Sequence, residues 1–128
     1  MKKVRGYNFS RSFMEERVPQ HIQNIVIKDY CKRKNLNFLM SVTEYSMPDS
    51  FFILKDLMNN LTGLYGIVAY SLFQMPEDNK IRIKIFKKIL KKKKKIFFAS
   101  ENLKLENKKD IDRLENIWSI KKTEFLNY

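Results

Sequence analysis

Cysteine and histidine are almost absent from this 128-residue chain, which contains one of each, Cys31 and His21. One cysteine cannot form a disulfide within the chain, and one histidine beside it cannot supply the ligand cluster of a structural zinc site. We therefore expect no structural metal and no cofactor. Glycine and proline are also scarce, at three each. This composition leaves no flexible linker, and the length suits a single α/β domain over residues 1–128.

Long hydrophobic runs are missing too. The longest runs, such as residues 51–54 and 67–70, contain four apolar residues, far fewer than a membrane-spanning helix needs. The first twelve residues, MKKVRGYNFSRS, lack the apolar stretch of about seven or more that a secretory signal requires. The sequence therefore predicts a cytoplasmic protein with no membrane span.

Positive charge is abundant but local. The formal net charge is +12, yet residues 79–95 carry ten cations and no acid, whereas the rest of the chain has 16 basic and 14 acidic residues. The lysine tract from Lys91 to Lys95 has no interleaved aromatic residues. It also ends a predicted helix, where cations complement the negative end of the helix dipole. The pattern favours a solvated helix end over contact with nucleic acid or anionic lipid.

Short apolar segments alternate with amphipathic ones along the chain. Val4, Tyr7 and Phe9 form a short pattern compatible with a strand at residues 3–10. Nearly continuous apolar character predicts strands at residues 37–42, 67–71 and 96–99, with 103–105 as a possible short extension or edge strand. Apolar residues at helical spacing predict helices at about 19–34, from 49 to about 61, from the 74–78 segment to about 91, and at about 109–123. Asp49 or Ser50 is expected to cap the second of these helices.

The same spacing identifies the side chains that should face the core. These are Ile22, Ile25, Val26, Ile27 and Tyr30 in the first helix, Phe52, Leu54, Leu57, Met58 and Leu61 in the second, Ile81, Ile85, Phe86 and Ile89 in the third, and Ile111, Leu114, Ile117 and Trp118 in the fourth. In the third helix the lysines are expected to face solvent.

Strand–helix alternation predicts an α/β fold of the flavodoxin-like kind, with a four-stranded, mostly parallel sheet covered by helices on both faces. All strand-to-helix loops then lie at one edge of the sheet, where ligands of such folds usually bind. The candidate ligand-binding residues in these loops and the adjoining first turns of helices are Ser10, Arg11, Arg17, Gln20, His21, Glu44, Tyr45, Ser71, Gln74, Glu101 and Asn102.

Arg11 and Arg17 share the first of these loops, just before a predicted helix. Guanidinium groups match phosphate and carboxylate, and a helix N-terminus adds positive potential, so the pair could hold an anion. Alternatively, both arginines are solvated and balance Glu15 and Glu16. Of the two, Arg11, which serines flank, is the stronger candidate, because Arg17 could pair with a neighbouring glutamate.

Four residues are weak candidates for catalysis. Ser10 would act as a nucleophile only with a base nearby, and no motif identifies one. His21 could transfer a proton, or like Gln20 form hydrogen bonds to a ligand or cap the helix. Glu44 and Glu101 could bind sugar hydroxyls or form an acid–base pair, but could equally cap helices. Tyr45 could stack on a sugar ring.

Several spaced motifs resemble a small bacterial family, the sporadic carbohydrate cluster proteins. The segments concerned are RGYNFSRSF, RVPQHIQNIVIKDYC, TEYSMP, GIVAYSLFQMPED and FFASENLKL, which together extend over nearly the whole chain. This resemblance implies an association with genes for surface polysaccharide or lipopolysaccharide sugars. It implies no particular reaction.

A more distant resemblance is to the catalytic domain of serine recombinases, or resolvases. That family also has Gly-Tyr in its first strand, followed by a serine and an arginine, but there the arginine precedes the serine. Here Ser10 precedes Arg11, and the segment after the third strand, SLFQMP, stands where the family places an aspartate and two arginines. The resemblance implies the recombinase fold without DNA cleavage.

The sequence thus predicts a protein of bacterial surface-carbohydrate biosynthesis that binds an anionic sugar or nucleotide-sugar at the strand-end edge. Two alternatives stay open. One is a non-catalytic partner or regulatory subunit of the cluster's enzymes, with a protein partner or a second copy of itself. The other is a recombinase-like nucleic-acid-binding domain, which the composition does not favour. Whether the protein turns its ligand over is not decided by the sequence.

Overall fold

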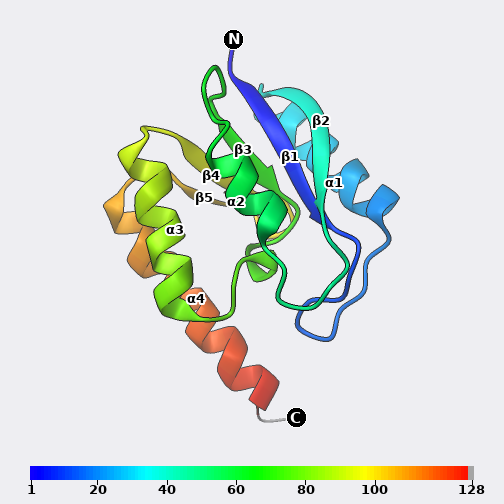
Figure 1. The fold of residues 1–128 in the computed structure, drawn as a ribbon, viewed down its shortest axis with the longest axis vertical. Coiled ribbons are helices and arrows are strands. Elements are labelled where there is room, and N and C mark those ends of the chain that lie inside the picture. Colours follow the sequence, from blue (N-terminus) through cyan, green and yellow to red (C-terminus); the bar gives the residue numbers. More distant parts are fainter. Residues whose placement is uncertain (127–128) are drawn as a thin grey trace.

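The computed structural model describes residues 1–126, in which strands and helices alternate (Figure 1). The elements are β1 (Lys3–Phe9), α1 (Gln20–Arg33), β2 (Asn37–Glu44), α2 (Phe52–Met58), β3 (Gly66–Ala69), a 3-10 turn η1 (Leu72–Gln74), α3 (Asn79–Lys91), β4 (Lys95–Phe98), β5 (Leu103–Leu105) and α4 (Lys108–Leu126). The predicted α/β class is confirmed.

The five strands form one sheet in the order β2-β1-β3-β4-β5. The first four strands are parallel, and β5 runs antiparallel to β4. The sequence predicted four strands and marked 103–105 only as a possible fifth. This segment joins the sheet because Leu105 pairs with Ile96 and is fully buried. Asn102, with a φ of 54°, forms part of the tight turn that reverses the chain.

Helices cover both faces of the sheet, as predicted (Figure 1). Successive side chains of a strand point to opposite faces. Val4, Val68 and Phe97 pack with α1, whereas Ile67 and Phe98, with other strand residues, pack with α2, α3 and α4. Within residues 1–126, no helix combines the length and hydrophobicity needed to cross a bilayer.

Two predictions about the face of α1 were wrong. Ile22 and Ile25 point outward, with 39% and 59% of their surface exposed, whereas Gln23 between them is fully buried. The reason is that the first turn of α1 lies beside the end of β1, whose backbone still needs hydrogen-bond partners there. Gln23 supplies them, as described below for the site.

The inner faces of α2 and α3 also differ from the prediction. Phe52 is 62% exposed and stacks on Tyr45, with 5.8 Å between ring centroids. Ile81 is 49% exposed, and Arg82 takes the buried position beside it. An arginine can occupy that position because its hydrogen bonds are satisfied there, by Glu115 and by two backbone carbonyls.

The predicted cap of α2 is also wrong. Neither Asp49 nor Ser50 occupies the capping position, which is held by Phe51 without a side-chain hydrogen bond. Instead, the backbone N–H groups of Ile53 and Leu54 donate to the carboxylate of Glu44 at the end of β2, each at 3.0 Å. The cap thus comes from a residue distant in sequence, which local pattern could not reveal.

The lysine tract is more tightly held than a solvated helix end. The helix α3 ends at Lys91 as predicted. Beyond it, the ammonium groups of Lys92 and Lys94 donate to the carbonyls of Met58 and Leu64, each at 2.6 Å. These two lysines fix the chain between α3 and β4 against the end of α2 and the loop that joins α2 to β3.

A β-bulge in β2 sets the orientation of its carboxyl half. Arg5 pairs with Leu39 and Tyr7 pairs with Val42, so Met40 and Ser41 together stand opposite Gly6. One extra residue reverses the faces of all the residues that follow. As a result Glu44 faces α2, where it caps the helix.

Gly6 accommodates this bulge because it has no side chain. A Cβ there would overlap Ser41 Oγ and lie 2.9 Å from Cε1 of Phe38. We expect Gly6→Ala to lower the free energy of unfolding by about 1–3 kcal/mol through overpacking, measured by urea denaturation. Ser41→Gly in the same chain should recover most of the loss. Unchanged stability in Gly6→Ala would contradict the packing described here.

Cys31 lies in the core between α1 and the sheet, with 1% of its surface exposed. Burial raises the pKa of its thiol to about 11, compared with about 8.5 for a free cysteine. We therefore expect iodoacetamide to label the native protein slowly at about pH 8 and faster as the pH approaches 11, because only the thiolate reacts. Mass spectrometry should show rapid labelling in urea. Equally fast labelling of the native protein would exclude a buried thiol.

Candidate functional site

A cavity of about 640 Å³ opens at the carboxyl end of β1. Its walls come from the β1–α1 loop, the β2–α2 loop, and the η1 turn with the residues after it. We call it the strand-end cavity. It is lined by the cations Arg11 and Arg17, the acids Glu15, Asp49 and Glu77, the hydroxyls of Ser10, Ser12 and Ser46, and the rings of Phe9, Phe13, Phe51 and Phe73, among others.

Arg11 is held in place against one wall of this cavity. Its Nη1 donates to the carbonyl of Tyr45 at 2.7 Å. The guanidinium carbon lies 4.1 Å from the ring centroid of Phe9 and 5.2 Å from that of Phe51. These contacts orient the guanidinium while leaving most of its five N–H donors available to a ligand.

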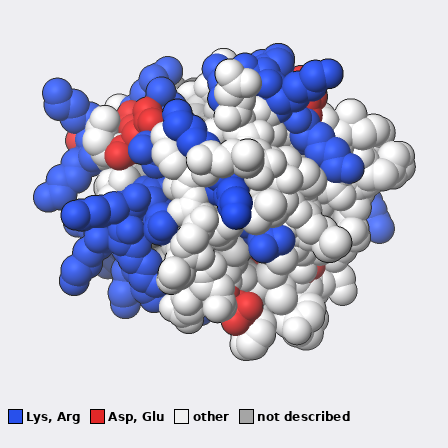
Figure 2. Space-filling view, turned by 90° about the horizontal axis from the view of Figure 1, so that it is seen from above, with Lys and Arg blue, Asp and Glu red and all other residues white. Residues whose placement is uncertain are grey.

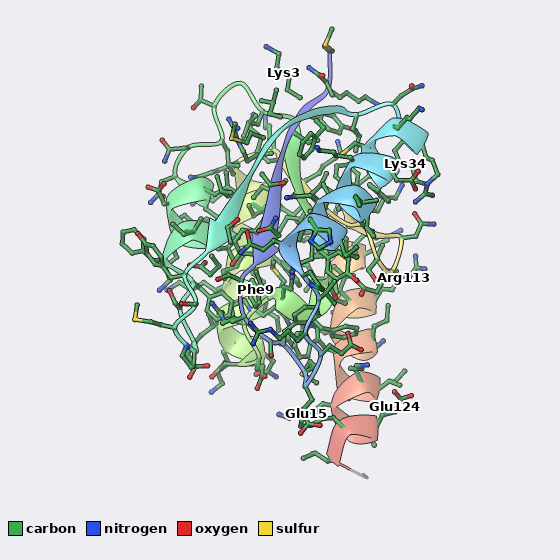
Figure 3. The ribbon with its side chains drawn as sticks, turned by 90° about the vertical axis from the view of Figure 1, so that its right-hand side faces the viewer. Lys3, Phe9, Glu15, Lys34, Arg113 and Glu124 are labelled. Carbon is green, nitrogen blue, oxygen red and sulfur yellow. The ribbon has the colours of Figure 1, made fainter. Side chains whose placement is uncertain are left out.

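The β1–α1 loop is folded back on itself by a tight turn. Phe13 and Glu16 exchange backbone hydrogen bonds at 2.9 and 2.8 Å. Between them, Met14 and Glu15 both have positive φ, at 48° and 63°. This is the type I′ geometry, in which glycine or asparagine is usual because other side chains are strained there. Figure 3 shows Phe9 at the end of β1 and Glu15 far out in this loop. The turn brings Arg17 back to the cavity that Arg11 lines.

Neither arginine forms an ion pair within the described part of the chain. Among residues 1–126, no carboxylate oxygen lies within 4.0 Å of Arg11 or Arg17. Neither arginine is paired directly with Glu15 or Glu16, and Arg17 is exposed, so the alternative of a solvated arginine stays open for Arg17. Glu15 lines the same cavity as both arginines without pairing with either.

Ser10 lies beside Arg11 at the cavity wall. Its hydroxyl donates to the carbonyl of Glu44 at 3.2 Å, and within the described chain no side-chain base bonds to it. His21 and Gln20 are exposed in the first turn of α1, and neither lines the cavity. The structure thus groups Ser10, Arg11 and Arg17 and leaves His21 and Gln20 outside.

Glu44 sits behind the cavity rather than in it, with 1% of its surface exposed. Its carboxylate accepts five hydrogen bonds, from the hydroxyls of Tyr7 and Ser50 and from the backbone N–H groups of Tyr45, Ile53 and Leu54. Burial and the adjacent Glu44 carboxylate raise the pKa of Tyr7, which keeps that hydroxyl a donor. Glu44 therefore ties β1, β2 and α2 together.

Glu101 plays a similar part at the end of β4. It accepts hydrogen bonds from the backbone N–H of Leu72 and the hydroxyl of Ser71, each at 2.7 Å. Burial raises the pKa of the Glu101 carboxyl, and these two bonds offset part of the rise. The strands before Glu44 and Glu101 are three spacings apart, or about 14 Å at ~4.8 Å each. This is farther than an acid–base pair on one glycosidic bond requires.

Two buried glutamines connect these elements. Gln23 accepts from the backbone N–H of Phe9 at 3.0 Å and donates to the carbonyls of Phe9 and Val18 at 2.9 and 2.8 Å. The side-chain amide of Gln74 donates to Gln23 at 2.8 Å and its oxygen accepts from the N–H of Ser71. Both glutamines are fully buried, so Gln74 and Ser71 support the cavity from behind.

The lining of the strand-end cavity differs in part from the predicted site. It includes residues that the sequence did not predict, and some predicted residues lie outside it. Glu15, Asp49 and Glu77 line the cavity, although they were not among the expected site residues; their only signal is that they fall in loops at this edge. Tyr45 contributes its carbonyl, while its ring is 49% exposed beside the ring of Phe52. Asn102 lines a different cavity on the α1 face.

Among the solved structures that share this fold are two recombinase domains. A resolvase family site-specific recombinase from Streptococcus pneumoniae superposes with a TM-score of 0.67 over 94% of this chain and 89% of that chain, at 8% identity. The N-terminal catalytic domain of TP901-1 integrase gives 0.66 over 97% and 99%, at 13% identity. No protein-family model matches the chain, and no curated protein matches it. The expected likeness to recombinase catalytic domains is thus confirmed for the fold alone.

Proposed function

We propose that this protein binds a small anionic ligand, a sugar or nucleotide-sugar bearing phosphate or carboxylate, in the strand-end cavity. The observation that carries the proposal is the fixed guanidinium of Arg11. It is held by the Tyr45 carbonyl and two phenylalanine rings, and no carboxylate oxygen of residues 1–126 lies within 4.0 Å of it. A preoriented arginine binds an anion without the entropy loss of ordering a free side chain.

The rest of the lining suits a ligand with hydroxyls as well as charge. Glu15, Asp49 and Glu77 line the cavity together with three serines. Carboxylates and hydroxyls form hydrogen bonds with sugar hydroxyl groups. In this proposal the arginines contact the anionic group, and Glu15, Asp49 and Glu77 contact the sugar hydroxyls. The sequence had predicted that Glu44 and Glu101 would contact those hydroxyls.

The biological setting proposed is bacterial surface-carbohydrate biosynthesis. This part of the proposal rests on the sequence motifs RGYNFSRSF, TEYSMP and GIVAYSLFQMPED and their resemblance to sporadic carbohydrate cluster proteins. The arginines, acids and serines that line the cavity are compatible with a sugar ligand that carries an anionic group, and they do not identify a reaction.

Replacing Arg11 by alanine tests the proposal. A panel of nucleotide-sugars and sugar phosphates is screened by thermal shift for ligands that raise the unfolding midpoint of the intact protein. We expect Arg11→Ala to weaken binding of such a ligand by about ten- to a hundredfold, because each charge-assisted hydrogen bond contributes about 1.5–3 kcal/mol. Because Arg11→Ala also loses the hydrogen bond to the Tyr45 carbonyl, its unfolding midpoint without ligand is expected to differ from that of the intact protein. The quantity compared is therefore the shift in midpoint that the ligand produces in each protein.

Arg33→Ala is the matched control, since Arg33 is an exposed arginine of α1 paired with Asp29. It removes the same charge and should leave the ligand-induced shift unchanged. The proposal fails if no ligand in the panel stabilises the intact protein. It also fails if Arg33→Ala weakens binding as much as Arg11→Ala.

Nucleic-acid binding is a second candidate, favoured by the fold shared with a site-specific recombinase and an integrase catalytic domain. Contacts driven by charge alone weaken steeply with salt. Duplex DNA binding that persists at about 200 mM salt and is lost in Arg11→Ala would support this candidate over a sugar ligand.

A further inference from the structure

Four cations converge on a second cavity, on the side of the sheet that carries α1. Lys2, Lys34, Lys104 and Arg113 line a space of about 360 Å³. They come from four separate parts of the chain: before β1, just after α1, in β5 and in α4. Figure 3 shows Lys34 and Arg113 on one side of the molecule, away from Phe9. We call this space the basic cavity.

The basic cavity lies toward the opposite edge of the sheet from the strand-end cavity. Three of its lining residues, Lys2, Leu36 and Tyr65, directly precede the strands β1, β2 and β3. Figure 2 looks down on this end of the molecule and shows lysine and arginine side chains gathered mainly on its left and upper parts, with few acidic groups. The two cavities share no lining residue.

The cavity lies where α1 stops short of the last strand, β5. The buried cluster under α1 includes Val4, Val68 and Phe97 but no residue of β5. Lys104 of β5 pairs across the sheet with Phe97 and is exposed. A notch remains between the end of α1, β5 and the start of α4, with Phe97 in its wall.

Aromatic rings position three ammonium groups around this notch. The rings of Tyr65 and Phe97 stack, with centroids 6.1 Å apart. The Nζ atoms of Lys2 and Lys95 lie 5.1 and 4.5 Å from the Tyr65 centroid, and that of Lys34 lies 5.8 Å from the centroid of Tyr30. Cation–π contacts of this kind restrict where a flexible lysine places its charge.

This concentration of charge is only partly neutralised. Among the described residues, Glu106 is the one carboxylate in the lining, and it contacts Lys104 at 2.8 Å and Lys95 at 4.0 Å. Within residues 1–126, no carboxylate oxygen lies within 4.0 Å of Lys2, Lys34 or Arg113. Holding like charges around one concave space is unfavourable, and an anion with several charges would relieve the repulsion.

We propose that the basic cavity binds an oligophosphate, that is, a ligand with two or more adjacent phosphate groups. A single phosphate would leave most of the converging cations without a partner. A nucleic acid strand fits less well, because bases need a free aromatic face to stack on. Here the ring of Tyr65 is already in contact with Phe97 and with the ammonium groups of Lys2 and Lys95.

Calorimetric titration with inorganic tripolyphosphate, pyrophosphate and orthophosphate, at about 150 mM salt to screen diffuse attraction, tests this proposal. We expect one site per chain and affinity that rises with the number of phosphates. The double variant Lys34→Gln, Arg113→Gln should weaken tripolyphosphate binding by about tenfold or more, since two charge-assisted contacts are lost. Far-ultraviolet circular dichroism checks that the variant is folded.

The double variant Lys84→Gln, Lys88→Gln is the matched control, since it removes two exposed cations of α3 outside the cavity. We expect it to change binding by about twofold at most. Equal losses in the two double variants would show attraction to net charge and overturn the proposal. The proposal would also be overturned if an oligothymidine bound more tightly than tripolyphosphate and lost that binding in the Lys34→Gln, Arg113→Gln variant. Arg11→Ala should leave this binding unchanged, so the outcome is separate from that for the strand-end cavity.

Discussion

Replacing Glu44 with alanine is expected to lower the free energy of unfolding by about 3–5 kcal/mol. The carboxylate accepts five hydrogen bonds and is 1% exposed. Alanine would leave the Tyr7 hydroxyl and the backbone N–H groups of Ile53 and Leu54 without partners. Each buried donor left unsatisfied costs about 1–3 kcal/mol, reduced where water can enter. Urea denaturation measures the loss.

Two further variants distinguish this effect from ordinary loss of a helix cap. Asp78 caps α3 by accepting from the N–H groups of Lys80 and Ile81, but it is exposed, so Asp78→Ala should cost about 1 kcal/mol. Glu44→Gln keeps the shape but offers one acceptor oxygen instead of two, and should fall between wild type and Glu44→Ala. Equal losses for Glu44→Ala and Asp78→Ala would mean that the buried network contributes little.

Glu44 also shows where sequence reasoning reaches its limit. Apolar continuity and helical spacing were sufficient to place the four parallel strands and four helices, because burial on both faces of a sheet leaves that pattern. The bulge at Met40 and Ser41 leaves no such pattern. Yet this one extra residue determines that Glu44 faces α2 and not α1. A carboxylate at a strand end could therefore be predicted, but not the direction in which it points.

The same limit applies to polar residues inside apolar stripes. Gln23 is buried because the end of β1 and Gln74, 14 and 51 residues away, supply its hydrogen bonds. By contrast, the loop containing Ser10, Arg11 and Arg17 could be identified, because topology alone brings strand-end loops to one edge. What the sequence could not give is the fixed position of Arg11, which depends on Tyr45 and Phe51 in another loop.

Arg82 is the second residue whose replacement should have a large effect. It lies between α3 and α4, and its side chain is 4% exposed. It bonds Glu115 through two nitrogens at 2.7 and 2.6 Å, donates to the carbonyls of Pro76 and Glu77, and stacks on Trp118. Removing either Arg82 or Glu115 leaves the charge of the other buried without an ion-pair partner. Arg82→Ala and Glu115→Ala should each cost about 3–5 kcal/mol in unfolding free energy.

The surface pair Arg33–Asp29 provides an internal control. It joins the same kinds of groups at 2.9 Å, but its side chains are 53% and 62% exposed. Breaking it should cost about 0.3–0.5 kcal/mol, because water replaces the lost partner. The double variant Arg82→Met, Glu115→Leu removes both buried charges at once and should be more stable than either single alanine variant. If Arg82→Ala costs no more than Arg33→Ala in urea denaturation, then water solvates the stranded carboxylate of Glu115. The contact between α3 and α4 would then depend on Ile111, Leu114 and Trp118, which are buried in α4, and not on the ion pair.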